Sequence, residues 1–331
     1  MLEGSKMLAR QLLRQLIWET FNRHTSSGGA DIALVGSRRS GSTLLMQVIG
    51  HHKGMKSIDQ PFSVYTATGP QMEHLPWPAG GFFVQPSGAE RGALVAYMEA
   101  MRAGRLHVLE PWRFWCPDFH FRSDRLVLKT TDAHHILPLL EETGFRNILY
   151  FRHPVPQAIS CARNHWGDKL DVFARNAVFT SQVLNAAQRA ELEGLVGRVD
   201  AESELARYVL CWCLENMALF DTLAAGTPVV FYEDMVLDPD GTIDRLVALC
   251  DITRTPQMRG MLGNASVSVR GLSDAEGAAA IRDGDTHAMI GRWRKKVDDA
   301  ALERVQGILD LFPGCPYSAA EILPRSSEAS A

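Results

Sequence analysis

Residues 31–50, DIALVGSRRSGSTLLMQVIG, decide the fold that the rest of the chain completes. The apolar run 32–35 ends at Gly36, which is typical of a short buried strand. From Leu44 onward apolar residues recur at helical spacing, so the loop that holds Gly36 and Gly41 leads into a helix. The stretch therefore predicts a strand, a glycine loop and a helix in that order.

Such a loop is suited to an anion, because glycines let backbone N–H groups approach a ligand and a helix N-terminus attracts negative charge. Gly36, Gly41 and Thr43 match the phosphate-binding pattern G-x-x-x-x-G-K-[ST]. Ser42 stands where that pattern has the lysine that reaches the terminal phosphates of a nucleoside triphosphate. The plain alternative is an ordinary tight turn between a strand and a helix.

Composition places the chain among large single-domain proteins. Its 331 residues are 46% hydrophobic, which is enough for a substantial core. The formal charge of −4 gives no overall attraction to nucleic acid, so an anion site has to be local. The six cysteines are dispersed and form neither a zinc pattern nor a disulfide framework, so no metal is expected.

Further strand-like runs occur along the chain, and helical patterns separate them. They are KSIDQPF at 56–62, RLVLKT at 125–130, NILYF at 147–151 and VVFYED at 229–234. Strands that alternate with helices predict an α/β fold with a mainly parallel sheet covered by helices on both faces. Ligands of such sheets bind at the carboxyl ends of the strands.

The two ends of the chain are predicted to lie outside the main domain. Residues 1–28 hold an amphipathic helix, 29–315 form one domain with acceptor-side insertions, and 316–331 are expected to be a flexible tail. No apolar run is long enough to span a bilayer. The N-terminal helix lacks the features of a signal peptide, so a cytoplasmic protein is expected. Whether this helix docks on the domain, on a partner or on a membrane surface stays open.

A second anion-binding feature follows the strand at 147–151. Arg152 comes directly after it, with Pro154 next and Ser160 eight positions on. Arginine offers a planar fork for phosphate, and a serine one or two helical turns later can present its hydroxyl to the same group. An arginine at a strand end is also often only a helix cap or part of a surface ion pair.

These features together resemble the sulfotransferases that use 3′-phosphoadenosine 5′-phosphosulfate (PAPS). The loop sequence Arg-Ser-Gly-Ser-Thr at 39–43 resembles their 5′-phosphosulfate loop, and Arg-x-Pro followed by Ser resembles their 3′-phosphate site. The segments 231–252 and 291–305 resemble the family's Tyr-Glu-Asp strand and its cofactor-closing segment. The resemblance covers about residues 31–310 and implies the three-layer fold of P-loop nucleoside triphosphatases.

The resemblance also implies residue roles. Arg39 stands where the family has its catalytic Lys or Arg, and Arg38 stands where many relatives have proline. The residues that would hold the cofactor are Gly36, Arg38, Arg39, Ser40, Gly41, Ser42, Thr43, Arg152, Ser160, Arg292, Trp293 and Arg294. The alternative for the last three is that Trp293 packs in the core and its basic neighbours face solvent.

The residue that takes the acceptor proton is less well marked. Carbohydrate- and tyrosine-sulfating relatives use a glutamate before a proline, and this chain has Asp59-Gln60-Pro61 there, so Asp59 is the candidate base. Cytosolic relatives use a histidine after Lys-Thr, which makes His135 the alternative. Glu110 is a third option.

The resemblance implies in-line transfer of a sulfuryl group from PAPS to an acceptor hydroxyl, with release of 3′-phosphoadenosine 5′-phosphate (PAP). The loop arginine and the Gly-Arg-Trp-Arg segment favour the carbohydrate and tyrosine branch, hence a saccharide or another small metabolite as acceptor. A P-loop kinase-like enzyme and a non-catalytic PAP-binding protein stay open as alternatives. The sequence also leaves open whether the chain forms a homodimer.

Overall fold

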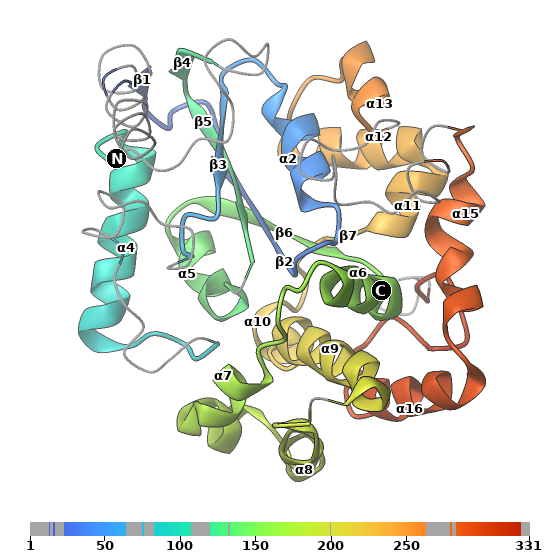
Figure 1. Cartoon of the computed structure of the whole chain (residues 1–331). Coiled ribbons are helices and arrows are strands. Elements are labelled where there is room, and N and C mark those ends of the chain that lie inside the picture. The colour runs from blue at the N-terminus through green and yellow to red at the C-terminus, as the bar shows by residue number, and fades with distance from the viewer. Residues whose placement is uncertain are drawn as a thin grey trace, which may run out of the picture.

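The computed structural model describes most of the chain in one α/β fold (Figure 1). The described residues are 13, 16, 23–63, 75, 83–106, 120–131, 133–198, 200–262, 279 and 283–325. Most of the stretch 64–82 and all of 107–119 lie outside them, and so do Glu110 and most of the predicted N-terminal helix. Among the described residues, no helix combines the length and apolar character needed to cross a membrane.

The centre of the fold is a parallel five-stranded sheet with the strand order β3-β5-β2-β6-β7. Its strands are β2 (Asp31–Gly36), β3 (Met55–Asp59), β5 (Arg125–Thr130), β6 (Phe145–Phe151) and β7 (Val229–Phe231). A separate parallel pair joins β1 (Arg23–His24) to β4 (Arg122–Ser123). The strand predicted at 32–35 therefore lies in the middle of the sheet.

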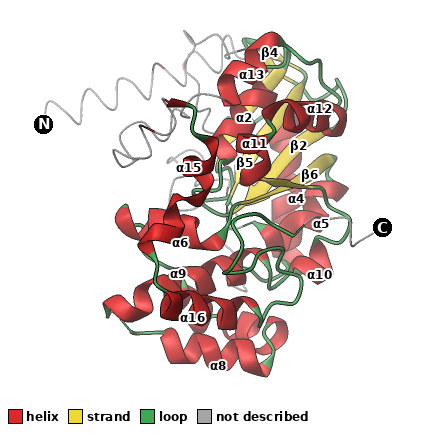
Figure 2. Cartoon of the chain, turned by 90° about the vertical axis from the view of Figure 1, so that its right-hand side faces the viewer, coloured by secondary structure: helices red, strands yellow, loops and turns green. Residues whose placement is uncertain are grey.

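Side chains of β2 alternate between two separate cores, one on each face of the sheet. Ala33 and Val35 belong to the larger core, whereas Ile32 and Leu34 belong to the smaller one. All four are fully buried, which explains why the strand reads as a continuous apolar run. The sheet is thus the middle of three layers, as Figures 1 and 2 show, and the predicted α/β fold class is confirmed.

Helices cover both faces of the sheet (Figure 2). The smaller core is covered by α2 (Ser42–Gly50), α12 (Pro239–Cys250) and α13 (Pro256–Leu262). The larger core is covered by α4 (Gly88–Arg102), α5 (Leu137–Glu142), α6 (Pro154–Arg163), α7 (Leu170–Arg175), α8 (Ala186–Leu195), α9 (Ala201–Asn216) and α16 (Asp299–Leu309). Shorter elements complete the chain: η1 (His134–Ile136), a π-helix η2 (Phe179–Val183), α10 (Phe220–Leu223), α11 (Tyr232–Leu237), α15 (Thr286–Gly291) and η4 (Arg292–Lys296).

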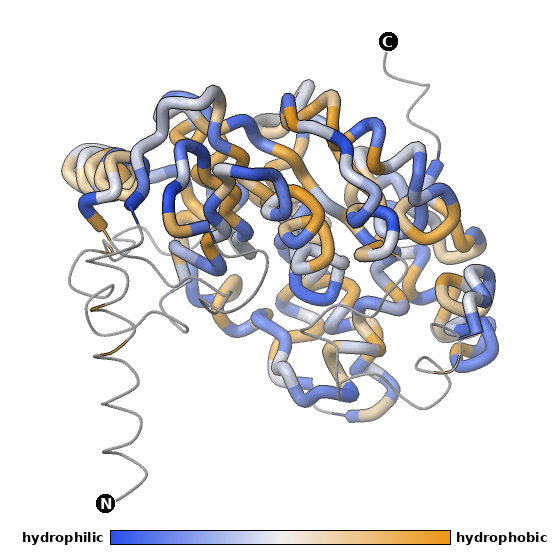
Figure 3. The backbone as a smooth tube through the Cα atoms, turned by 90° about the horizontal axis from the view of Figure 1, so that it is seen from above, coloured by the Kyte–Doolittle hydropathy of each residue, from blue (hydrophilic) through white to orange (hydrophobic). Residues whose placement is uncertain are grey.

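The helices carry the alternation of apolar and polar residues that this layering requires. In Figure 3 the backbone tube changes repeatedly between orange and blue along the helices, as expected when one side of each helix packs on a core. In α4, for example, Leu94, Tyr97, Met98 and Met101 are buried. Packing of these faces, more than helix propensity, holds the outer layers on the sheet.

Several predicted boundaries were wrong. The strand predicted at 56–62 ends at Asp59, and the strand predicted at 147–151 begins at Phe145. The strand predicted at 229–234 ends at Phe231, and α11 begins at Tyr232. The tail predicted from residue 316 is not free at its start, because the Tyr317 side chain is only 1% exposed and Ala319 only 3%. The folded domain therefore continues past residue 315.

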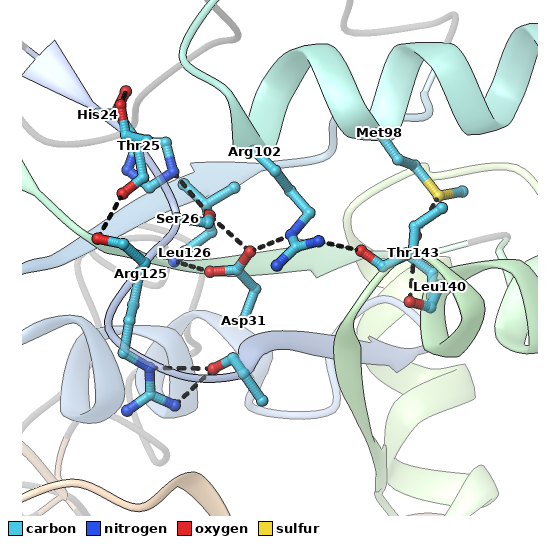
Figure 4. Close-up of polar contacts among 12 residues, drawn as sticks. His24, Thr25, Ser26, Asp31, Met98, Arg102, Arg125, Leu126, Leu140 and Thr143 are labelled. Carbon is cyan, nitrogen blue, oxygen red and sulfur yellow. Dashed lines mark hydrogen bonds and ion pairs between the residues drawn. The ribbon is translucent and has the colours of Figure 1, made fainter.

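A polar network fixes the amino end of β2, away from the glycine loop (Figure 4). The Asp31 carboxylate is fully buried and accepts hydrogen bonds from the Leu126 N–H and the Ser26 hydroxyl, at 2.7 and 2.6 Å. The same carboxylate forms an ion pair with Arg102 of α4 at 2.6 Å. Buried charges persist only when they are paired and hydrogen-bonded, so this network ties α4 to the central strand.

Candidate anion-binding site at the glycine loop

The glycine loop lies between β2 and α2, at the carboxyl end of the central strand. Its two glycines are required by the fold itself. A Cβ atom on Gly36 would lie 2.4 Å from the Tyr150 carbonyl oxygen of the neighbouring strand. Gly41 has a φ of +86° and precedes the first residue of α2, and a Cβ there would lie 2.8 Å from the Tyr232 ring.

Arg39 is the centre of the polar contacts around this loop. Its backbone is in the left-handed region, with φ +63°, which is unusual for a residue other than glycine. Its Nε donates to the Ser160 hydroxyl of α6 at 2.9 Å, and its guanidinium lies 5.5 Å from the centre of the Trp166 ring. Burial, and then the nearby charge of Arg152, lower the pKa of Arg39. A guanidinium stays protonated under these conditions, so the site concentrates positive charge.

Arg152 directly follows β6 and stands beside Arg39. Its Nη1 donates to the Arg39 carbonyl oxygen at 3.1 Å, and its guanidinium lies 4.4 Å from the centre of the Tyr232 ring. The Arg152 Nε is buried and has no hydrogen-bond partner among the described residues. A buried guanidinium N–H without a partner is costly and is expected where a ligand supplies the acceptor.

The remaining loop residues are held in place by their neighbours. Gln157 of α6 donates to the Arg38 carbonyl oxygen at 2.8 Å. The hydroxyls of Ser37 and Ser40 share a hydrogen bond at 3.2 Å, and both side chains are buried. Ser42 opens α2 and is also buried. The loop is thus a formed structure that places Arg39 and the N-terminus of α2 at one edge of the sheet.

Lys129 is a cation at this edge that sequence reasoning did not assign to the site. It is the fifth of the six residues of β5, which pairs with β2, and its ammonium lies 2.7 Å from Asp59 Oδ1. It also donates to the Thr43 hydroxyl at 3.3 Å. The signal that could have found it is a lysine at the carboxyl end of an apolar strand, the place where ligands of parallel sheets bind.

The two candidate bases lie at or just after the carboxyl ends of the neighbouring strands β3 and β5. Asp59 is the last residue of β3 and pairs in register with Lys129 of β5, so the ion pair joins adjacent strand ends. Its side chain is 28% exposed, which leaves room for contact with a ligand. His135 lies in η1 after β5, is buried, and has its ring 6.0 Å from that of Phe83. Asp59 is therefore the more accessible of the two.

The basic segment at 292–294 lies in η4 and packs near Arg152 through His153. Trp293 is only 2% exposed, and its ring centre lies 4.6 Å from that of His153. Arg294 Nη1 donates to the Ala319 carbonyl oxygen at 3.0 Å. Trp293 is thus a packing residue in this structure, which was the alternative to its expected role in stacking on a nucleotide, while Arg292 is half-buried.

A pocket adjoins the loop on the side of α6 and α9. Arg38 and Trp166 line it, together with residues of α9 that include Tyr208 and Trp212. Its polar lining includes Lys169 and Glu215, which form a buried ion pair at 2.7 Å. The Trp166 ring lines this pocket and also lies under the Arg39 guanidinium. The pocket therefore lies next to Arg39 and Arg152, here called the arginine pair.

The chain matches no protein-family model, and no curated protein matches it. Solved structures that resemble it include a sulfotransferase domain from the olefin synthase of Synechococcus PCC 7002, which is 16% identical with a TM-score of 0.41. That match covers 88% of this chain and 98% of the other. A sulfotransferase domain from the curacin biosynthetic pathway is 15% identical with a TM-score of 0.42, over 86% and 99%.

Mouse sulfotransferase SULT7A1, solved with PAP, is 14% identical with a TM-score of 0.39, over 89% of this chain and 87% of the other. These identities and TM-scores are low. The strand order and the two cores establish the fold, and the side chains around the glycine loop are the basis for a function.

Proposed function

We propose that this chain transfers a sulfuryl group from PAPS to a hydroxyl group of a small-molecule acceptor and releases PAP. The observation that carries the proposal is the joined pair Arg39 and Arg152 at the carboxyl edge of the sheet, with the Arg152 Nε buried and without a partner. Two adjacent guanidinium groups suit a ligand with two separate anionic groups. PAPS has both a 5′-phosphosulfate and a 3′-phosphate.

The residues present fit this ligand. The backbone N–H groups at Ser40, Gly41, Ser42 and Thr43 open α2 and would hold the 5′-phosphosulfate with Gly36 and Arg38 shaping the loop. Arg152 and Ser160 would hold the 3′-phosphate, with Arg292 and Arg294 adding positive charge. When bound, PAPS supplies an activated sulfuryl group. Arg39 would then stabilise the negative charge that develops on the leaving phosphate.

The acceptor site is proposed to be the region between Asp59 and the pocket beside Trp166. The aromatic and charged side chains of that pocket would contact one end of a hydroxylated acceptor such as a saccharide or glycosylated metabolite, whose bulk would lie outside the pocket because the pocket has room for only about one water molecule. Asp59 would accept the proton of the acceptor hydroxyl, with His135 as the alternative base. The ion pair with Lys129 holds the Asp59 carboxylate at the strand end.

A P-loop kinase-like enzyme is the second candidate, and the position of Lys129 is the observation that favours it. Its ammonium reaches Thr43 at the start of α2, so it could replace the lysine that the loop lacks. The buried Arg152 Nε, which lacks a partner among the described residues, favours PAPS over ATP. A 3′-phosphate could accept a hydrogen bond from this Nε, and ATP has no 3′-phosphate. A non-catalytic PAP-binding protein would keep the arginine pair and show binding without turnover.

Isothermal titration calorimetry with PAP and with magnesium-ATP separates these candidates. We expect PAP to bind and ATP to bind at least tenfold more weakly, and the reverse order would favour the kinase. Arg152→Ala should raise the Kd of PAP about tenfold to a hundredfold, because charge-assisted hydrogen bonds contribute about 1.5–3 kcal/mol each. Arg91→Ala, an exposed arginine of α4, is the matched control and should leave PAP binding unchanged.

Turnover is measured as release of PAP from PAPS over a panel of hydroxylated acceptors. Arg39→Ala should lower the turnover rate by about a hundredfold to a thousandfold, the usual effect of removing one group that stabilises transition-state charge. A wild-type chain that binds PAP but releases none above background with any acceptor would support the non-catalytic alternative.

A further inference from the structure

The C-terminal segment 317–321 is fastened to the domain beside the arginine pair. Tyr317 and Ala319 are buried. The Ala319 N–H donates to Gln306 Oε1 of α16 at 2.7 Å, and the Ala319 carbonyl oxygen accepts from Arg294 at 3.0 Å. Hydrogen bonds to α16 and to η4 therefore fix the backbone of this segment on the surface of the domain.

One buried carboxylate joins this segment to the anion site. Glu233 Oε1 accepts the His153 backbone N–H at 2.9 Å, and its Oε2 accepts the Tyr317 hydroxyl at 2.8 Å. Glu233 and Tyr317 are each only 1% exposed, and burial raises the pKa of the Glu233 carboxyl. His153 directly follows Arg152, and Tyr232, whose ring lies beneath the Arg152 guanidinium, directly precedes Glu233.

The His153 ring adds a second connection. Its Nδ1 accepts the Val155 N–H at 3.2 Å, which assigns the ring proton to Nε2. Nε2 then donates toward the carbonyl oxygens of Ser318 and Glu321, at 3.1 and 3.0 Å. Trp293 packs against the same ring. The backbone that carries Arg152 is thus held through both the N–H and the side chain of the next residue.

We propose that Glu233, His153 and Tyr317 are positioning residues that let the C-terminal segment hold Arg152 ready for a phosphate group. The inference rests on the proposed function, in which Arg152 receives the 3′-phosphate of the nucleotide. A guanidinium fixed before binding loses less conformational freedom when the ligand arrives, so affinity rises without a new contact to the ligand. The C-terminal segment thereby contributes to nucleotide affinity without touching the nucleotide.

The test compares PAP with adenosine 5′-phosphate, which lacks the 3′-phosphate. Titration calorimetry is carried out on the full chain and on Tyr317→Phe, which removes only the hydroxyl that Glu233 accepts. Without this positioning, Arg152 has to be immobilised when PAP binds. We expect the Kd of PAP to rise about tenfold, which corresponds to the free energy of immobilising one long side chain. The Kd of adenosine 5′-phosphate should stay within twofold, because that ligand does not use Arg152.

Tyr97→Phe is the matched control. The Tyr97 side chain is also buried, and its hydroxyl donates to the Pro61 carbonyl oxygen at 2.6 Å, away from Arg152. Both variants lose one buried hydrogen bond, but only Tyr317→Phe should change the preference for PAP. Gln306→Leu removes the hydrogen bond that the Ala319 N–H donates to Gln306 and so weakens the attachment of the C-terminal segment. This variant should also bind PAP more weakly and adenosine 5′-phosphate as wild type does.

The outcomes separate this inference from the proposed function. A wild-type chain that binds PAP no more tightly than adenosine 5′-phosphate overturns both. A wild-type chain that prefers PAP, with Tyr317→Phe weakening both ligands equally or neither, overturns only the positioning role. If Tyr317→Phe does not fold, the same comparison with Gln306→Leu decides, and an unchanged preference for PAP in that variant counts against the inference.

Discussion

At the scale of single residues, Asp59 is the group on which the proposed chemistry depends most. We expect Asp59→Asn to lower the turnover rate by about a hundredfold to ten-thousandfold, the usual contribution of a general base. The Kd of PAP should change less than twofold, because Asp59 faces Lys129 rather than the arginine pair. Rates of PAP release and calorimetric titrations of the same samples give both values.

His135→Gln is the companion variant for this test. It should keep most of the wild-type turnover rate, since His135 is buried next to Phe83. A large loss in His135→Gln together with a small loss in Asp59→Asn would transfer the role of base to the histidine. Asp59 would then serve only to hold the Lys129 ammonium near Thr43.

Arg39 and Arg152 stand out in the sequence because of their positions after apolar runs. Arg152 directly follows the run that forms β6, and Arg39 lies in the glycine loop after β2. Lys129 lies inside a strand, one residue before the end of β5, and its partners Asp59 and Thr43 come from segments 70 and 86 residues away (129 − 59 and 129 − 43). Only the order of strands in the sheet brings them together. Sequence patterns show which residues end a strand, but they do not show which strands are neighbours.

At the scale of elements, Gly41 links the glycine loop to α11. Gly41→Ala would place a Cβ 2.8 Å from the Tyr232 ring at a φ of +86°. We expect a loss of about 1–3 kcal/mol in the free energy of unfolding, from the strained backbone and the displaced ring. PAP binding should weaken as well, because Tyr232 supports Arg152. Urea unfolding and calorimetry measure the two effects.

Gly92→Ala is the matched control for that substitution. Gly92 lies on the exposed side of α4, and in the described part of the chain no atom lies within 4 Å of a Cβ placed there. Because alanine favours a helix over glycine, this variant should gain about 0.5–1 kcal/mol in the free energy of unfolding. A Gly41→Ala chain that is as stable as Gly92→Ala and binds PAP normally would show that the loop tolerates a side chain at position 41.

The strands were predicted more reliably than their ends, and α11 shows why. Nothing in the run VVFYED at 229–234 marks Phe231 as the last strand residue. The chain turns into a helix there because Tyr232 packs on Gly41 and the Glu233 carboxylate accepts the His153 N–H. These contacts are tertiary, and they outweigh the local preference of aromatic and β-branched residues for a strand.

At the scale of the whole molecule, two buried histidines should make the fold sensitive to mild acid. His24 lies at the β1–β4 pair and His153 beside the arginine pair. Burial is the main cause that lowers the pKa of each to about 4. The charged form of each ring is unfavourable only in the folded state. Unfolded chain takes up these protons near pH 6.5, so unfolding is favoured as the pH falls from 6.5 toward 4.

The expected loss is about 1.4 kcal/mol per pH unit for each histidine within that window, and none above pH 6.5 where both rings are neutral. Glu233 acts in the opposite direction, because burial raises the pKa of its carboxyl and its folded form takes up a proton more readily. The difference between wild type and a histidine variant isolates the histidine contribution from that of Glu233. Urea unfolding between pH 7.5 and 5 should therefore show a shallower decline for His153→Gln and for His24→Gln, whose amides cannot be protonated. If both variants lose stability as steeply as wild type, the acid sensitivity arises from other groups.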